Sequence, residues 1–261
     1  MGRSANLTTT AKTTVVDAIN EAEIKDLRLY CDPECKKLRS ALAKRYNVES
    51  ENVFLSNGSD DILNFSFFGF GQNGVAFADI TYGFYSVFAE INRVPYVEIP
   101  LEKDFTINIE KYLNVNKTVF IANPNAPTGI CLSLSEIEEI VKSNPDSVVV
   151  IDEAYVDFGN ESCVPLIRKY DNLLVTQTFS KSRSMAGARL GFGVANPALL
   201  QDLSTLKYSK NPYNINRMTM AAGTAALKDA SYYKDGCEKI IRTREKTKQE
   251  LLDLGFSVLD S

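Results

Sequence analysis

Seven short apolar runs constrain the fold of this chain more than any other feature of its sequence. Helical or turn-rich segments separate the runs, which cover residues 53–55, 75–77, 94–97, 118–122, 148–151, 173–175 and 190–194. Nearly continuous apolar runs of this length are typical of strands buried on both faces, and their alternation with helices indicates parallel pairing. We therefore predict an α/β fold in which helices cover both faces of a mostly parallel, seven-stranded sheet.

The segments outside these runs predict three helices. Leu38, Leu42 and Tyr46 recur at every fourth position of residues 34–46, which is typical of an amphipathic helix. We also predict a short helix over residues 15–23 and a long charged helix over residues 231–254 that ends at Gly255. The polar residues 4–14 are expected to form a mobile arm, and residues 256–259 are expected to begin a strand.

The composition of the 261 residues excludes several classes of function. The chain has no histidine, which excludes mechanisms and zinc sites that need imidazole, and we expect no metal site. Five dispersed cysteines indicate reduced thiols. The net charge is −4 and the basic residues are scattered, which argues against nucleic acid as a partner. Because the chain has neither an apolar run of membrane-spanning length nor a secretory signal, we predict a cytoplasmic protein without a membrane partner.

Polar residues follow five of the seven runs. In order along the chain they are Ser59 and Asp60, Tyr82, residues 123–129, residues 152–155, and Lys181. Parallel sheets bind ligands at the carboxyl ends of their strands. This coincidence predicts one ligand site at that edge of the sheet.

Lys181 points most directly to a type of chemistry. A lysine that is desolvated beside the end of a strand can form a Schiff base with an aldehyde cofactor. Thr178, Ser180 and Arg189 are close to it in the sequence, and hydroxyl and guanidinium groups bind phosphate oxygens. We interpret this stretch as a pyridoxal phosphate site. The structural alternative is a surface lysine before a turn of small residues.

Asp152 ends the apolar run at 148–151, where an unpaired carboxylate would be costly. A protonated pyridine nitrogen would pair with it, and the cofactor ring would then withdraw electrons from a substrate carbanion. Tyr155 would hydrogen-bond the hydroxyl group of the same ring. The alternative is an aspartate that caps the following turn.

Ser59 and Asp60 precede an apolar helical segment, so the backbone N–H groups there form a candidate anion cradle at a helix N-terminus. An ordinary helix cap by either side chain is the alternative. Tyr82 is a candidate to stack on a flat ring, although a core aromatic is the commoner role for such a residue.

Five segments of the chain also carry a family resemblance: LRLY (27–30), TYGFY (81–85), DEAYVDF (152–158), SKSRSMAGARLG (180–191) and PYNIN (212–216). They resemble the fold type I, class II pyridoxal phosphate-dependent aminotransferases, and most closely the histidinol-phosphate aminotransferases. The resemblance runs from about residue 27 to the C-terminus. It implies an N-terminal arm and short helix over residues 1–26, a large pyridoxal phosphate-binding domain over 27–230, and a linking helix with the first strand of an incomplete small α/β domain over 231–261.

The resemblance also implies a role for each site residue. Lys181 would bind the cofactor covalently and move protons, Asp152 would pair with the pyridine nitrogen, and Tyr155 would bond the ring hydroxyl. Tyr82 would stack on the ring, and Tyr30 would reach into the site of the neighbouring subunit of a homodimer. The cofactor phosphate would be held by Ser59, Asp60, Thr178, Ser180 and Arg189.

The chain departs from the family pattern in three places. Where the family has a second asparagine that supports the ring hydroxyl, this chain has Ala126, so Asn125 or Tyr155 would have to replace that bond. The family's N-terminal substrate-binding motif is not recognisable in residues 4–14. The sequence also ends before the position of the family's substrate-anchoring arginine, so impaired transamination is one expectation.

The resemblance implies transfer of an amino group between glutamate and imidazole-acetol phosphate, a reaction of histidine biosynthesis. The substrates would be a small amino-phosphate together with glutamate and 2-oxoglutarate. A threonine-phosphate decarboxylase-like lyase is the second enzyme hypothesis. The third is a cofactor-binding but inactive dimerising fragment.

Overall fold

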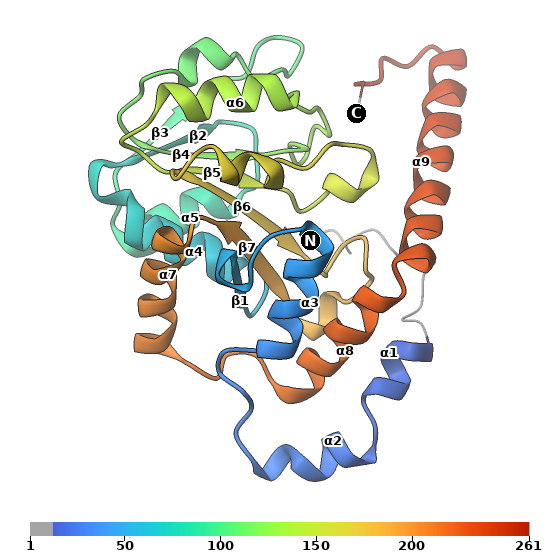
Figure 1. Ribbon diagram of the computed structural model, residues 1–261. Coiled ribbons are helices and arrows are strands. Elements are labelled where there is room, and N and C mark those ends of the chain that lie inside the picture. The colour runs from blue at the N-terminus through green and yellow to red at the C-terminus, as the bar shows by residue number, and fades with distance from the viewer. Residues whose placement is uncertain (1–12, 261) are drawn as a thin grey trace.

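The computed structural model describes residues 13–260, and Figure 1 labels its elements. The strands are β1 (Val53–Ser56), β2 (Val75–Ala78), β3 (Tyr96–Ile99), β4 (Thr118–Ala122), β5 (Val149–Asp152), β6 (Leu173–Thr178) and β7 (Gly191–Ala195). The α-helices are α1 (Thr13–Ala18), α2 (Glu21–Lys25), α3 (Lys36–Tyr46), α4 (Ser59–Phe70), α5 (Phe84–Asn92), α6 (Leu134–Ser143), α7 (Pro197–Lys210), α8 (Arg217–Lys228) and α9 (Ala230–Asp253).

All seven strands form one sheet in the order β1-β7-β6-β5-β4-β2-β3. β7 runs antiparallel to both of its neighbours, and the other four pairs are parallel. The six remaining strands therefore end at the same edge of the sheet, where ligands of such folds bind. The predicted α/β fold with a mostly parallel seven-stranded sheet is confirmed.

Successive side chains of the strands are buried on opposite faces of the sheet. Val119 and Ile121 of β4 belong to one hydrophobic core, which α3, α6 and α8 complete. Phe120 belongs to a second core, which α4, α5 and α7 complete. Helices thus cover both faces of the sheet, and α9 runs along one side of the molecule (Figure 1). None of the helices in the described part of the chain has the length and apolar character needed to cross a membrane.

The N-terminal helix differs from its prediction. Residues 15–23 do not form one helix, because Asn20 interrupts it: its side chain accepts a hydrogen bond from the backbone N–H of Glu23 (3.2 Å) and so begins α2. Asparagine is a favoured residue at a helix N-terminus for this reason. α1 begins at Thr13, inside the segment predicted to be an arm. The rest of that arm, residues 4–12, lies outside the described residues.

Two predicted strands need correction. β3 begins at Tyr96 and not at Val94, because the Val94 backbone N–H bonds to Ala89 O (2.9 Å) at the end of α5 and Pro95 has no N–H to donate. Residues 256–260 form no strand, since the described chain places no other strand beside them. Gly255 does end α9 in a left-handed conformation (φ +87°), as predicted. The division into three domains stays a prediction.

Candidate active site

One cavity of about 260 Å³ lies where β4, β5 and β6 end. All the predicted site residues line it except Tyr30 and Asn125. Its full lining is Ser59, Asp60, Tyr82, Ala122, Pro124, Ala126, Asp152, Ala154, Tyr155, Thr178, Ser180, Lys181, Ala186 and Arg189.

Asp152, the last residue of β5, is buried at 5 % exposure. Two hydroxyl groups donate hydrogen bonds to its carboxylate, Tyr85 Oη at 3.2 Å and Thr176 Oγ1 at 3.3 Å. Within residues 13–260 no cation forms an ion pair with it. Burial, and to a smaller extent the neighbouring Asp60 carboxylate, raises the pKa of Asp152 to about 6. A cationic group placed in the cavity would stabilise this carboxylate.

Lys181 lies in the turn that follows β6. Two backbone hydrogen bonds close this turn, from Ser184 N to Lys181 O (3.0 Å) and from Met185 N to Phe179 O (3.0 Å). Lys181 Nζ lies 4.8 Å from the centre of the Tyr155 ring. The primary amine and the phenol, which follow two different strands, thus meet at the cavity that Asp152 also lines.

A candidate anion cradle is formed where α4 begins. The residue before α4 is Gly58, whose φ of +86° favours glycine, and no side chain caps the helix. Gly191 packs directly against this turn, since a Cβ atom there would lie 2.2 Å from Ser59 N. Neither Ser59 nor Asp60 caps α4, which excludes that alternative from the sequence analysis. The first backbone N–H groups of α4 are therefore free of a side-chain cap, and their residues line the cavity.

The Asp60 carboxylate orients two other side chains of the site. It accepts hydrogen bonds from Tyr82 Oη (2.9 Å) and from Arg189 Nη2 (3.1 Å). Burial, and then the charge of Asp60, raises the pKa of Tyr82, so its hydroxyl group stays protonated. Because a carboxylate repels an anion, a phosphate at this place would meet the backbone N–H of Asp60 and not its carboxylate.

Asn125 does not line this cavity, so its contact with the cofactor stays a prediction. Its Oδ1 accepts from Thr81 Oγ1 (2.8 Å), and its Nδ2 donates to Ile80 O (3.0 Å) and Thr128 Oγ1 (3.1 Å). These bonds tie the carboxamide to Ile80 and Thr81, which follow β2, and to Thr128 of its own loop. The next residue, Ala126, lines the cavity.

Tyr30 also lies away from the cavity of its own chain. Its side chain is 80 % exposed, and its ring stacks on that of Tyr213 with centroids 4.5 Å apart. Its role in the site of a neighbouring subunit stays a prediction.

The sequence interpretation gave no role to Tyr85 or Thr176, which both donate to Asp152. Tyr85 could have been found, because it follows Tyr82 by nearly one helical turn at the start of α5. Thr176 could not, because its contact with Asp152 depends on the register of β5 against β6.

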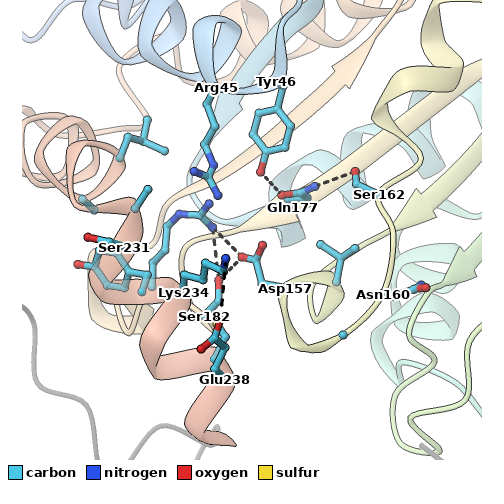
Figure 2. Close-up of a pocket in the computed structure, with 18 of the residues that line it drawn as sticks. Arg45, Tyr46, Asp157, Asn160, Ser162, Gln177, Ser182, Ser231, Lys234 and Glu238 are labelled. Atoms are coloured by element: carbon cyan, nitrogen blue, oxygen red, sulfur yellow. Dashed lines mark hydrogen bonds and ion pairs between the residues drawn. The ribbon is translucent and has the colours of Figure 1, made fainter. Parts of the chain in front are cut away.

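A larger cavity of about 500 Å³ lies on the other side of the Lys181 turn, lined by Ser182, Arg183, Asp157 and the N-terminal part of α9. Figure 2 shows its polar residues, including the hydrogen bonds from Tyr46 to Gln177 (2.5 Å) and from Ser182 to Asp157. Within the described residues, no group of acidic or thiol side chains could hold a metal ion.

Comparisons with known proteins agree with this geometry. The family model "Aminotransferase class I and II" matches residues 2–261. The chain is 52 % identical to a histidinol-phosphate aminotransferase of Brachyspira hyodysenteriae, over 95 % of this chain and 71 % of the relative. It is 47 % identical to that of Lactococcus lactis subsp. cremoris, over 95 % of this chain and 70 % of the relative.

A solved structure shares the fold as well. The histidinol-phosphate aminotransferase of Sinorhizobium meliloti, in complex with pyridoxal-5'-phosphate, superposes with a TM-score of 0.84 at 25 % identity and covers 96 % of this chain and 70 % of that one. The chain therefore belongs to the class I and II aminotransferases and, within them, to the histidinol-phosphate aminotransferase family.

Proposed function

We propose that this chain binds pyridoxal phosphate and transfers an amino group between glutamate and imidazole-acetol phosphate. The observation that carries the proposal is the cavity at the end of β4, β5 and β6, where Lys181, a buried carboxylate and an uncapped helix N-terminus meet. The names of the relatives support the substrates. Transamination is favoured over the lyase alternative because these relatives are all aminotransferases.

The residues present fit pyridoxal phosphate. Asp152 is a buried carboxylate without a cation, which the protonated pyridine nitrogen would supply. Gly191 keeps a side chain away from the backbone N–H of Ser59, and Gly58 keeps one away from the Arg189 guanidinium. The backbone N–H groups of Ser59 and Asp60 would bind the phosphate. The other phosphate contacts in this proposal come from Thr178, Ser180 and Arg189.

When bound, the cofactor supplies an electron-withdrawing ring that stabilises negative charge on the substrate carbon beside the amino group. Asp152 would keep the ring nitrogen protonated, and Tyr82 would cover one face of the ring. Tyr155 would donate to the ring hydroxyl, a bond that Ala126 cannot make. Lys181 would hold the cofactor through its Nζ, and the same amine would serve as the group that accepts and donates a proton.

The proposed working unit is a homodimer. Tyr30 is exposed in its own subunit, and the relatives' family supports a role for it beside the partner's cofactor. Small anionic substrates, and neither nucleic acid nor a membrane, are the proposed partners. A cytoplasmic location is part of the same proposal.

Product analysis tests the function. Protein loaded with pyridoxal phosphate is mixed with glutamate, and 2-oxoglutarate and pyridoxamine phosphate are measured by chromatography. We expect both products in equal amounts. Carbon dioxide released from threonine phosphate, without either product, would support the lyase. A cofactor-loaded protein that yields none of these products would support the inactive fragment.

A further inference from the structure

The two residues after Lys181 are tied to a segment that follows the neighbouring strand. Ser182 Oγ donates a hydrogen bond to Asp157 (Figure 2). Arg183 Nη1 donates to the same Asp157 oxygen at 3.1 Å. Arg183 Nη1 also lies 3.3 Å from Ser182 Oγ. The three side chains thus form a closed triangle, which we call the Asp157 clamp.

The clamp is built around a buried cation. The Arg183 side chain is 4 % exposed, whereas that of Asp157 is 29 % exposed. The Arg183 guanidinium also lies 5.0 Å from the centre of the Phe179 ring, and Phe179 begins the same turn. A buried guanidinium held by a carboxylate, a hydroxyl group and an aromatic ring has little freedom to move, because each displacement would break one of these contacts.

The clamp joins the two segments whose relative position decides the geometry of the site. Asp157 comes two residues after Tyr155, in a short 3₁₀-helix (Val156–Phe158), and Ser182 comes directly after Lys181. The clamp therefore holds the segment that carries Tyr155 against the turn that carries Lys181, and the distance of 4.8 Å between Lys181 Nζ and the Tyr155 ring depends on this contact.

We propose that Asp157, Ser182 and Arg183 are positioning residues that hold the Lys181 amine in place beside Tyr155. Ser182, Arg183 and Asp157 line the larger cavity and not the cofactor cavity. They would therefore act on the cofactor only through Lys181 and Tyr155. The inference rests on the proposed function for the identity of the group that Lys181 binds.

The first test replaces Arg183 by Met, which keeps the apolar stem and removes the cation instead of leaving it unpaired. Deuterium exchange at residues 179–185 of the cofactor-free variant should be faster than in the parent, because the turn has lost its anchor. The rate at which added pyridoxal phosphate becomes bonded to Lys181, followed by absorbance and borohydride trapping, should fall by about 10- to 100-fold, the size of effect that an ångström-scale misplacement produces.

A double-variant cycle assigns the effect to the contact. We expect D157N and R183M each to slow cofactor capture, and the double variant to be no slower than the slower single one, since both changes remove the same pair. R183K, which keeps the charge, should recover part of the rate. E138Q is the matched control, because it breaks the exposed Glu138–Lys169 ion pair (3.0 Å) and should leave exchange and capture unchanged.

Two results would overturn the inference. One is an R183M protein with parental exchange at residues 179–185 and a parental capture rate. The other is a double variant whose defect equals the sum of two independent ones. Failure of the proposed function looks different, because the parent protein itself would then not bond the cofactor at Lys181.

Discussion

Asp152 and Glu153 are adjacent buried carboxylates with opposite environments. Asp152 faces the open cavity and receives two hydroxyl groups. Glu153, on the other side of the strand end, receives Ser162 Oγ (2.7 Å), Gln177 Nε2 (2.7 Å) and the backbone N–H of Cys163 (2.5 Å). Burial raises the pKa of both, to about 6 and about 7 respectively.

The contrast separates a carboxylate that awaits a ligand from one that the fold already satisfies. Glu153 binds the loop after β5 to β6 through short hydrogen bonds, so its role is structural. Asp152 keeps one side open to the cavity, so a bound cation would complete its environment. Motif residues that are neighbours in sequence therefore differ in function because a strand places them on opposite faces.

Asp152→Asn should give the largest effect on cofactor binding. It removes a charged hydrogen-bond partner worth about 1.5–3 kcal/mol, so the affinity for pyridoxal phosphate should fall by about 10- to 100-fold. The thermal stability of the cofactor-free variant should equal or exceed that of the parent, because an unpaired buried charge is gone. Titration by absorbance and thermal melting measure both. If the variant were less stable than the parent without cofactor and bound the cofactor with parental affinity, Asp152 would be the structural carboxylate, contrary to the prediction.

Glu153→Gln should lower stability and leave cofactor affinity unchanged, the opposite of Asp152→Asn. The amide places a donor among groups that already donate to this position, so the free energy of unfolding should fall by about 1–3 kcal/mol. Cofactor affinity of the folded protein should stay at the parental value. Chemical denaturation and cofactor titration check this prediction, and unchanged stability would contradict it.

The free energy of unfolding should depend on pH through Asp152 and Glu153. Both pKa values are raised above their ordinary values of 3.8 and 4.5, so the folded protein binds protons more tightly than the unfolded one. Their stabilising contribution is present below about pH 4 and is lost as the pH rises to about 7, with a slope of up to about 1.4 kcal/mol per pH unit for each group.

Comparison of the parent with Asp152→Asn isolates the contribution of Asp152 to the pH dependence of stability. The stability of the cofactor-free parent relative to that variant should fall between about pH 4 and pH 6. Denaturant melts at several pH values measure the difference. A difference that does not change with pH would mean that Asp152 ionises in the folded protein as it does in water.

Tyr85→Phe should have the smallest effect. It removes one neutral donor from Asp152 and leaves the ring in its core, so we expect a loss of about 0.5–1.5 kcal/mol in cofactor affinity. The same titration measures it. A loss as large as that of Asp152→Asn would mean that the hydroxyl group, and not the charge, is what the site depends on.

The sequence predicted the sheet and most of the site because both depend on local patterns. Apolar runs identify strands, and Lys181, Asp152 and Ser59 each come within six residues after one. Contacts between distant segments were not predictable. The Asp60–Arg189 ion pair spans 129 positions, and the carboxamide of Asn125 bonds to Ile80, 45 positions away. Such contacts depend on strand register and on loop conformation, which residue types alone do not specify.

The central claim is that Lys181 is the residue that bonds pyridoxal phosphate. The purified protein is mixed with pyridoxal phosphate, its visible spectrum is recorded, and borohydride is added before peptides are analysed by mass spectrometry. Lys181→Ala, treated in the same way, is the control. We predict a new absorbance band and a single label on Lys181, both absent from the variant. A label spread over surface lysines, or no band in the parent protein, would contradict the account.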